Sequence, residues 1–388
     1  MALTERKNKN FFILFLSIYL FLMPFDFYPL IEGISVSRFL VFLPLLGALF
    51  EMKSFKTFKG ESFWVLWYFA AVSFTYFYSV DKSQTKERII SLFLNFVVII
   101  LFSMRPYSRD EIEKLFNAVA LSGWLFLVLT LLYGEFKYGR LFVVIGGLQQ
   151  DPNYFCGFII FPICYYLWRF LENSKFWNLA SALILSVPIF LTGSRGGLLA
   201  LLGSVFVIFV IYIKRGDSSR FVKFFFAALI IFLVVLVFWR YLPENITNRF
   251  TLEYTLEDNG AGRFRIWEEI IESFKNSELW NQVFGHGAAT VKNFNSRQQV
   301  AHNIYIETLI EMGVTGVLML LLMYFKYGTM ALKLKEGFLV ASFIGYMIMT
   351  LSMSLYSYKP LWNIMLLIVI LTVYNKGEIS DNQSVNNR

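Results

Sequence analysis

Three short polar segments in this chain carry residue types that can bind or move charge. The first is Thr192-Gly193-Ser194-Arg195-Gly196-Gly197, which places one Arg among three Gly. Gly residues leave room for a bulky anion to approach the backbone, and the planar guanidinium of Arg matches the geometry of phosphate oxygens. The same pattern also suits a tight turn at a membrane interface, with Arg195 extending towards water.

The second segment contains Arg263 and Arg265 at the start of a stretch with helical periodicity. Apolar residues at 267, 270, 271 and 274 alternate with charged residues at 268, 269, 272 and 275. This spacing predicts an amphipathic helix that lies on a membrane or on a helical bundle. The N-terminus of a helix favours anions, although both Arg residues could instead balance Glu268 and Glu269 in solvent.

The third segment begins at His302, which precedes a long apolar stretch. Asn303, Glu307 and Glu311 follow at intervals of four and form a polar stripe on one helix face. The imidazole pKa of about 6.5 suits proton transfer near neutrality, but an interfacial His can equally be a hydrogen-bonded structural residue. His286, between two Gly residues in a turn, receives no catalytic role.

Metal and nucleotide signatures are missing from the sequence. It contains two His and two Cys, and it has no Walker A, HExxH, GxSxG or DxD pattern. We therefore expect no metal and no other cofactor, and a substrate that brings its own leaving group. Asp26 and Glu32 keep a metal-assisted mechanism open.

The elements that position these segments are predicted to be membrane helices. The chain has 388 residues, of which 57% are hydrophobic and 16% are charged, whereas soluble domains carry about 25% charged residues. We expect one integral membrane domain over residues 1–388, with an all-α polytopic fold. About 12 apolar blocks approach spanning length: 11–27, 38–50, 63–80, 89–103, 115–133, 153–171, 176–191, 198–213, 221–238, 304–325, 338–355 and 361–374.

The distribution of basic residues predicts the orientation of these helices. With both termini in the cytoplasm, 20 of the 35 Lys and Arg residues are cytoplasmic and 8 lie in short outer loops. The net charge of +8 then reflects topology, and no nucleic-acid partner is expected. The basic segment 1–10 precedes an apolar run without a cleavage site, which predicts an uncleaved first helix. Residues 239–302 form one long extracytoplasmic loop between the ninth and tenth predicted helices.

The order of these motifs resembles that of the O-antigen ligase family. The motifs are Asp151-Pro152-Asn153, Thr192–Gly197, Gly262-Arg263-Phe-Arg-Ile-Trp267, Gly285-His-Gly287, and His302-Asn-Ile-Tyr305 followed by Glu311-Met-Gly313-Val-Thr-Gly316. The resemblance implies a multi-pass glycosyltransferase of the bacterial inner membrane whose active site faces the periplasm. Its donor would be a glycan on undecaprenyl pyrophosphate, and its acceptor a lipid A-core sugar.

The same resemblance assigns roles to individual residues. Arg195 and Arg263 would bind the donor pyrophosphate, with Arg265 as a helper, and His302 would act as the base or orient the acceptor. A single displacement of this kind inverts the configuration at the sugar carbon.

Three alternative functions remain open. Within the family, a polymerase would join repeat units from the same donor, and a protein O-glycosyltransferase would be expected to carry extra soluble mass. Outside the family, twelve helices also suit a secondary transporter, although the polar segments gather on one side and no internal repeat is evident.

Overall fold

The computed structural model describes residues 11–26, 28–31, 34–55, 60–214 and 218–386. The basic segment 1–10, for which the sequence predicts an uncleaved start, and Glu32 lie outside these residues. The described chain is mostly helical, and each predicted apolar block falls on helical structure. The main helices are α1 (Phe11–Phe21), α2 (Val36–Leu40), α3 (Phe42–Phe50), α4 (Phe63–Phe74), α5 (Lys82–Ser103), α6 (Arg109–Tyr133), α7 (Pro152–Asn173), α8 (Phe176–Leu191), α9 (Arg195–Lys214), α10 (Ser218–Trp239), α15 (Ile304–Leu332), α16 (Gly337–Thr350) and α17 (Lys359–Asn386).

Fewer helices than expected are long and apolar enough to cross a membrane. Within the described residues there are six of these: α6, α7, α9, α10, α15 and α17. Helices α1, α8 and α16 are apolar but shorter. The expected second block is divided between α2 and α3, and α5 carries the charged run Lys86-Glu87-Arg88. The chain is a multi-pass membrane protein, but several blocks that the sequence suggested as spans form short or interrupted helices.

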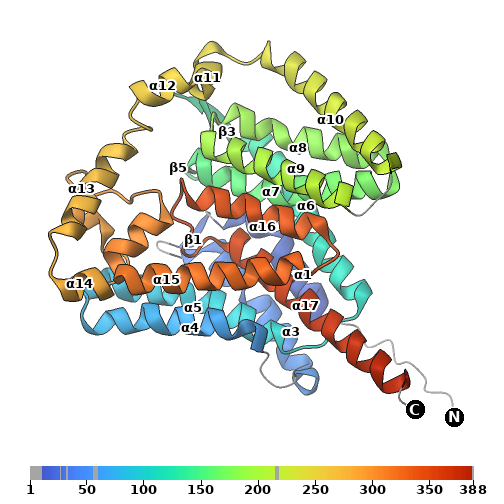
Figure 1. The fold of residues 1–388 in the computed structure, drawn as a ribbon, viewed down its shortest axis with the longest axis horizontal. Helices are drawn as coiled ribbons and strands as arrows, with labels where there is room; N and C mark the ends of the chain where they lie inside the picture. Colours follow the sequence, from blue (N-terminus) through green and yellow to red (C-terminus); the bar gives the residue numbers. More distant parts are fainter. Residues whose placement is uncertain (1–10, 27, 32–33, 56–59, 215–217, 387–388) are drawn as a thin grey trace.

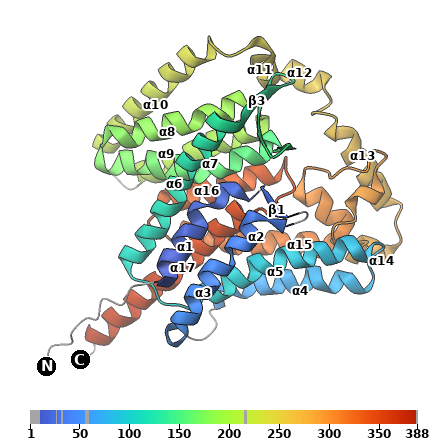
Figure 2. The ribbon, with the colours of Figure 1, turned by 180° about the vertical axis from the view of Figure 1, so that it is seen from behind.

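The helices pack as one bundle (Figures 1 and 2). Helix α9 packs on α16, α7 lies between α6 and α8, and α1 contacts α3 and α6. Helices α4 and α5 form a layer beside α15 and α17. Helix α10 lies at the edge of the bundle, and only 6% of its most apolar 18-residue stretch is buried. Its exposed apolar side chains suit a lipid environment, because acyl chains are as apolar as Leu.

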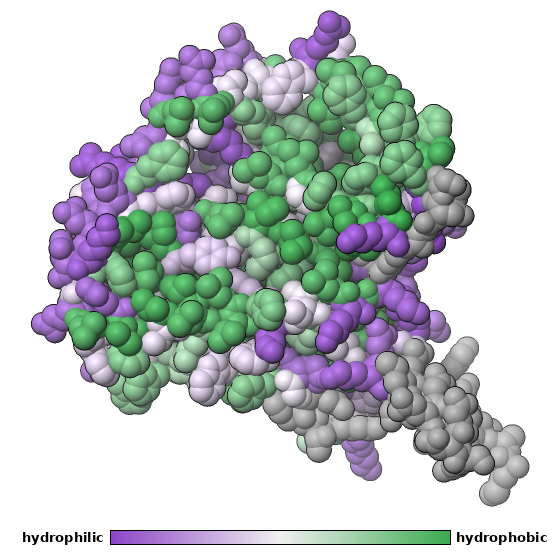
Figure 3. All heavy atoms as spheres, viewed as in Figure 1, coloured by the Kyte–Doolittle hydropathy of each residue, from purple (hydrophilic) through white to green (hydrophobic). Residues whose placement is uncertain are grey.

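Polar structure gathers at one end of the bundle. Here lie α11 (Glu244–Thr247), the 3₁₀ turn η5 (Asn248–Phe250), α12 (Leu252–Glu257), α13 (Arg263–Lys275) and α14 (Leu279–Phe284). A small antiparallel sheet of β3 (Gly134–Lys137), β4 (Arg140–Ile145) and β5 (Leu148–Gln149) lies at the same end. Figure 3 shows hydrophilic side chains along the edge formed by α12 and α13, and apolar side chains over the middle of the same face.

Helix α13 occupies the segment in which the sequence predicts an amphipathic helix. Ile266 and Ile270 are buried on its apolar face and pack with Val291, Ala301 and Ile310. The helix therefore lies on the bundle, against the start of α15, and its charged residues face outward.

Helix α15 is broken at Gly313, whose φ of 65° and ψ of −167° are not helical. The break leaves carbonyl groups without helical partners, and the backbone of the Gly285–Gly287 turn bonds to two of them. The His286 N–H donates to the Ile310 carbonyl at 3.0 Å, and the Gly287 N–H donates to the Glu311 carbonyl at 2.8 Å. Two motifs that are distant in sequence are thus parts of one backbone junction.

Candidate functional site

Four Arg side chains from separate segments meet at the polar end of the bundle, and we call them the arginine cluster. They are Arg140 on β4, Arg195 at the start of α9, Arg249 on η5 and Arg263 at the start of α13. Arg249 is an electrostatic neighbour of Arg140, Arg195 and Arg263. Two carboxylates, Asp151 and Asp258, interact with the cluster. Positive charge is therefore in excess.

This excess charge changes the acidity of the buried guanidinium groups. Burial and the neighbouring Arg249 lower the pKa of Arg140 to about 10, although Asp151 opposes the shift. Burial and the charge of Arg195 also lower the pKa values of Arg249 and Arg263, the latter against the opposing effect of Asp151. A lowered Arg pKa means that the surroundings disfavour the cation. A bound anion would relieve this repulsion, so the cluster is suited to hold one.

The turn before α9 explains why the cluster forms around Arg195. Its carbonyl groups accept hydrogen bonds from two of the other cluster members: Arg140 Nε donates to the Thr192 oxygen at 2.8 Å, and Arg249 Nε donates to the Gly193 oxygen at 3.3 Å. Ser194 accepts from the Gly197 N–H at 3.1 Å and donates to Asn153 Oδ1 at 2.8 Å. The turn is thereby fixed to α7 as well.

The glycines of this turn do not have the role that the sequence suggested. We expected them to leave backbone room for an anion, but protein atoms occupy that room. A Cβ on Gly196 would lie 2.1 Å from Ser352 Oγ, and one on Gly197 would lie 2.5 Å from Cys156 Sγ. Gly193, with φ of 58°, lies against the Arg249 side chain. The glycines therefore allow close packing of neighbouring side chains.

Arg195 is ion-paired with Asp258 through both terminal guanidinium nitrogens, at 2.6 and 3.3 Å. Asp258 Oδ1 also accepts from the Ala261 N–H at 2.9 Å. Burial raises the pKa of Asp258, but Arg195 and the Ala261 N–H outweigh burial and lower the pKa below its ordinary value. Asp258 is therefore a carboxylate anion at neutral pH.

Arg263 and His302 are brought together by the packing of α13. Trp267 Nε1 donates to the Ala301 carbonyl at 2.7 Å, which fixes the first turns of α13 beside residue 302. Burial lowers the pKa of His302, and the charge of Arg263 lowers it further, while Asp151 partly opposes the shift. The imidazole is consequently neutral near neutral pH, as a proton acceptor must be.

The backbone at His302 is held from within the bundle. His302 has φ of 52°, in the left-handed region that non-Gly residues rarely adopt. Its N–H donates to Glu307 Oε1 at 3.0 Å, and the Ser354 hydroxyl donates to the same oxygen. Asn303 Oδ1 caps α15 by accepting from the N–H groups of Tyr305 and Ile306, at 3.0 and 3.1 Å.

The expected polar stripe is therefore internal. Glu307 and Glu311 are fully buried, and the Arg88 guanidinium interacts electrostatically with both carboxylates. Arg88 also stacks over the Tyr356 ring at 4.0 Å. The stripe supports the residues around His302 and is not an open polar path into the membrane.

Two other residues singled out from the sequence are directed elsewhere. Arg265 pairs with Glu269 at 3.1 Å on the outer face of α13, and its side chain is 62% exposed. The structure does not bring it together with Arg195, Arg263 and His302. The His286 ring bonds to Ser277 Oγ at 2.9 Å and packs on Phe294, which agrees with a structural role.

The sequence reasoning missed Arg140, Arg249 and Asp258 as members of the site. Their only signal was that each lies in a polar segment on the same expected side of the membrane as Arg195 and Arg263. No local motif surrounds Arg140 or Arg249, because their positions depend on hydrogen bonds to the turn before α9.

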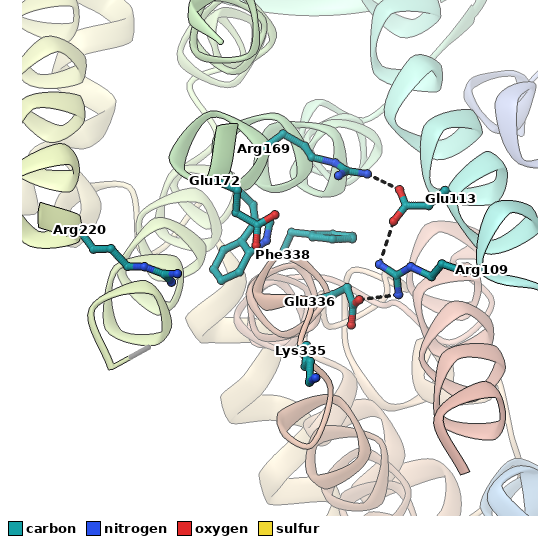
Figure 4. Close-up of a pocket in the computed structure, with 9 residues that line it drawn as sticks. Arg109, Glu113, Arg169, Glu172, Arg220, Lys335, Glu336 and Phe338 are labelled. Carbon is teal, nitrogen blue, oxygen red and sulfur yellow. Dashed lines mark hydrogen bonds and ion pairs between the residues drawn. The ribbon is translucent and has the colours of Figure 1, made fainter. Parts of the chain in front are cut away.

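A second charged region lies at the other end of the bundle, where a cavity of about 490 Å³ is lined mainly by charged side chains. Arg109 bonds to Glu113 and Glu336 at 2.8 and 2.7 Å, and Arg169 also bonds to Glu113 (Figure 4). These charges compensate one another, unlike those of the arginine cluster. Arg169 follows Asp151 by 18 residues along helix α7, so the two residues lie about 27 Å apart along the helix axis, at 1.5 Å per residue.

Two acidic residues, Asp26 and Glu32, made a metal-assisted mechanism possible from the sequence, and the structure describes only the first. Asp26 forms an ion pair with Lys359 at 2.7 Å, and Glu32 lies outside the described residues. Within the described part of the chain, no three His, Cys, Asp or Glu side chains are grouped as metal ligands.

Comparisons with known proteins show similarity to a family model and to solved structures. Residues 179–321 match the family model described as O-Antigen ligase, which confirms the family resemblance over that segment. No curated protein matches the chain. A solved structure described as "Structural coordination of polymerization and crosslinking by a peptidoglycan synthase complex" is 20% identical, covers 81% of this chain and 97% of its own, and has a TM-score of 0.46.

Proposed function

We propose that this chain, which carries an O-antigen ligase domain over residues 179–321, transfers a glycan from undecaprenyl pyrophosphate to a lipid A-core sugar at the periplasmic face of the bacterial inner membrane. The observation that carries the proposal is the approach of Arg195, Arg263 and His302 to one another. Arg195 and His302 each interact with Arg263, although they come from α9 and from the start of α15.

The arginine cluster supplies the electrostatic part of the reaction. As the bond between the sugar carbon and the pyrophosphate oxygen breaks, the electron pair remains on the pyrophosphate. Guanidinium groups that are already in position stabilise this developing charge without reorganisation. Arg195 and Arg263 bind the pyrophosphate, and Arg140 and Arg249 add to the positive potential around it.

His302 supplies the proton-transfer part. The acceptor hydroxyl oxygen attacks the sugar carbon on the face opposite the pyrophosphate, and the neutral imidazole takes the hydroxyl proton. The configuration at that carbon is inverted by this single displacement. We propose that the protein supplies this chemistry from its own side chains, without a metal.

The direct test is transfer of glycan from purified lipid-linked donor to rough lipopolysaccharide by the purified full-length protein. We expect His302→Ala, Arg195→Ala and Arg263→Ala each to lower kcat/KM by 100-fold or more, since general-base and charge-stabilising groups are typically worth 10²–10⁴ in rate. Arg265→Ala is the matched control, because it removes an exposed Arg from the same helix, and it should retain wild-type activity.

Several results would contradict the proposal. Full activity of His302→Ala would remove the base, and loss of activity in EDTA would require a metal. Retained configuration in the product, measured by NMR, would rule out a single displacement. Transfer to a second lipid-linked repeat unit in place of the core sugar would identify a polymerase that uses the same donor.

A further inference from the structure

We propose that Asp258 is an internal counter-anion that occupies Arg195 between turnovers, yields that place to the donor pyrophosphate and returns to help release the pyrophosphate product. The inference rests on the proposed function, because it takes pyrophosphate as the ligand of the arginine cluster. It adds a residue for which neither the motifs nor the family match suggests a role.

The geometry of the ion pair supports a competition between Asp258 and phosphate. The Asp258 carboxylate faces both terminal nitrogens of Arg195, at 2.6 and 3.3 Å, which is the two-point arrangement that a phosphate would adopt. The side chains of Arg195 and Asp258 are 21% and 20% exposed. An anion arriving from outside can therefore reach the pair, but it cannot take both nitrogens while the carboxylate remains.

Asp258 is also distinct among the acidic groups near the cluster. Within the described residues, it is the one carboxylate in direct ion-pair contact with a cluster Arg. Asp151 interacts with Arg140 and Arg263 only electrostatically, and its side chain instead caps α7 by accepting from the Asn153 N–H at 2.7 Å. If the Asp258 carboxylate moved away, the cap of α7 would remain intact and the terminal nitrogens of Arg195 would be available to another anion.

The turn that carries Asp258 is under backbone strain. Four consecutive residues, Asn259 to Gly262, have φ between 53° and 74°, and among them the left-handed region is unfavourable for Ala261 in particular. The hydrogen bond from the Ala261 N–H to Asp258 Oδ1 helps to hold this conformation. Because strain opposes the paired state, it reduces the free energy needed to move the carboxylate away. Arg263 follows this turn directly.

The charge of the product explains why such a competitor is useful. When the glycan leaves, the lipid pyrophosphate loses an ester bond and gains about one negative charge. The arginine cluster therefore binds the product more tightly than the donor, and product release becomes slow. A tethered carboxylate that competes for Arg195 weakens product binding at every turnover without a change in the other Arg residues.

Binding of inorganic pyrophosphate to the purified full-length protein, measured by calorimetry in magnesium-free buffer, tests the inference. We expect Asp258→Asn to bind pyrophosphate about fivefold more tightly than the wild type, since a partly exposed ion pair is worth roughly 1 kcal/mol. Glu269→Gln removes a carboxylate of similar exposure, 26%, that is paired with Arg265 and not with a cluster Arg, and it should bind like the wild type. Arg195→Ala should bind more weakly.

The outcomes separate this inference from the proposed function. If the wild type does not bind pyrophosphate, the donor site itself is wrong. If the wild type binds and Arg195→Ala does not, but Asp258→Asn binds with unchanged or lower affinity, only the counter-anion role is wrong, and Asp258 merely orients Arg195.

Transfer kinetics provide a second measurement, with Asp258→Ala as a second variant should Asp258→Asn fold poorly. If Asp258 is a counter-anion, either variant should have a lower KM for the donor and a lower kcat than the wild type, because the product leaves more slowly. A purely structural role raises KM.

Discussion

At the scale of single residues, the environment of His302 determines its protonation. Burial and Arg263 both disfavour the imidazolium, so the pKa of His302 lies below its ordinary value of about 6.5. The neutral form therefore predominates at neutral pH. In the proposed mechanism, the charge on Arg263 therefore acts twice, by attracting pyrophosphate and by keeping His302 unprotonated.

This arrangement predicts the pH dependence of transfer. The proposed mechanism requires the neutral imidazole, so kcat/KM should fall as pH decreases through the lowered pKa of His302 and should be level above it. In Arg263→Gln the opposing cation is lost, so the pKa of His302 should rise and the acidic limb should move to higher pH.

Histidine NMR measures the same shift independently of activity. The chain has two His residues, so the His302 resonance is assigned as the one missing from His302→Gln. A titration midpoint that is unchanged or lower in Arg263→Gln would contradict the proposed contact.

At the scale of elements, hydropathy and periodicity predicted where the helices lie but not all of their lengths. The apolar blocks fall on helices because burial in lipid requires internally satisfied backbone groups. Helix α13 lies where its spacing predicts, since Ile266 and Ile270 have an apolar surface to cover. The interruption between α2 and α3 and the break at Gly313 depend on neighbouring chain segments, which local hydropathy does not contain.

The candidate site was predictable only in part, for a related reason. Arg195, Arg263 and His302 were found through motifs at the starts of helices. Arg140 and Arg249 join them through side-chain hydrogen bonds to carbonyl groups of the turn before α9. Such bonds produce no periodic pattern in the sequence. The predicted role of the glycines in that turn was also wrong, because their packing partners, such as Ser352, are distant in sequence.

The break in α15 gives an element-scale prediction with an internal control. In Gly313→Ala, the new Cβ would lie 2.3 Å from the Val283 oxygen, at a φ and ψ combination that suits only Gly. We expect a loss of about 3 kcal/mol in the free energy of unfolding, measured by denaturant titration in detergent micelles. Transfer should fail because the start of α15 is displaced.

Gly328→Ala in the same helix is the control. A Cβ at residue 328 would meet Phe343 at an ordinary 3.5 Å, so Ala should be neutral or should stabilise the helix by up to about 1 kcal/mol. Equal stability of the two variants would show that the break at Gly313 is not required.

At the scale of the whole molecule, the arginine cluster and the compensated cavity around Arg109 lie at opposite ends of the bundle. The excess of basic residues in the expected cytoplasmic loops favours a cytoplasmic position for the Arg109 end. The arginine cluster would then face the periplasm, as the proposed function requires.

Cysteine labelling tests this orientation. Cys156 and Cys164 are buried, so a single introduced Cys gives the main signal. Glu135→Cys, on exposed β3 near the cluster, should react with a membrane-impermeant maleimide in intact cells, and exposed Lys333→Cys should react only after the inner membrane is permeabilised. The reverse pattern would place the site in the cytoplasm.

The junction between the Gly285–Gly287 turn and the break in α15 also restricts how the protein can be recombined with relatives. The backbone N–H groups of His286 and Gly287 bond to carbonyl groups of α15, so a graft whose turn had a different backbone conformation would leave those carbonyl groups unpaired. Chimaeras built to exchange acceptor preference should therefore be spliced upstream of residue 285, keeping the turn and α15 from the same parent.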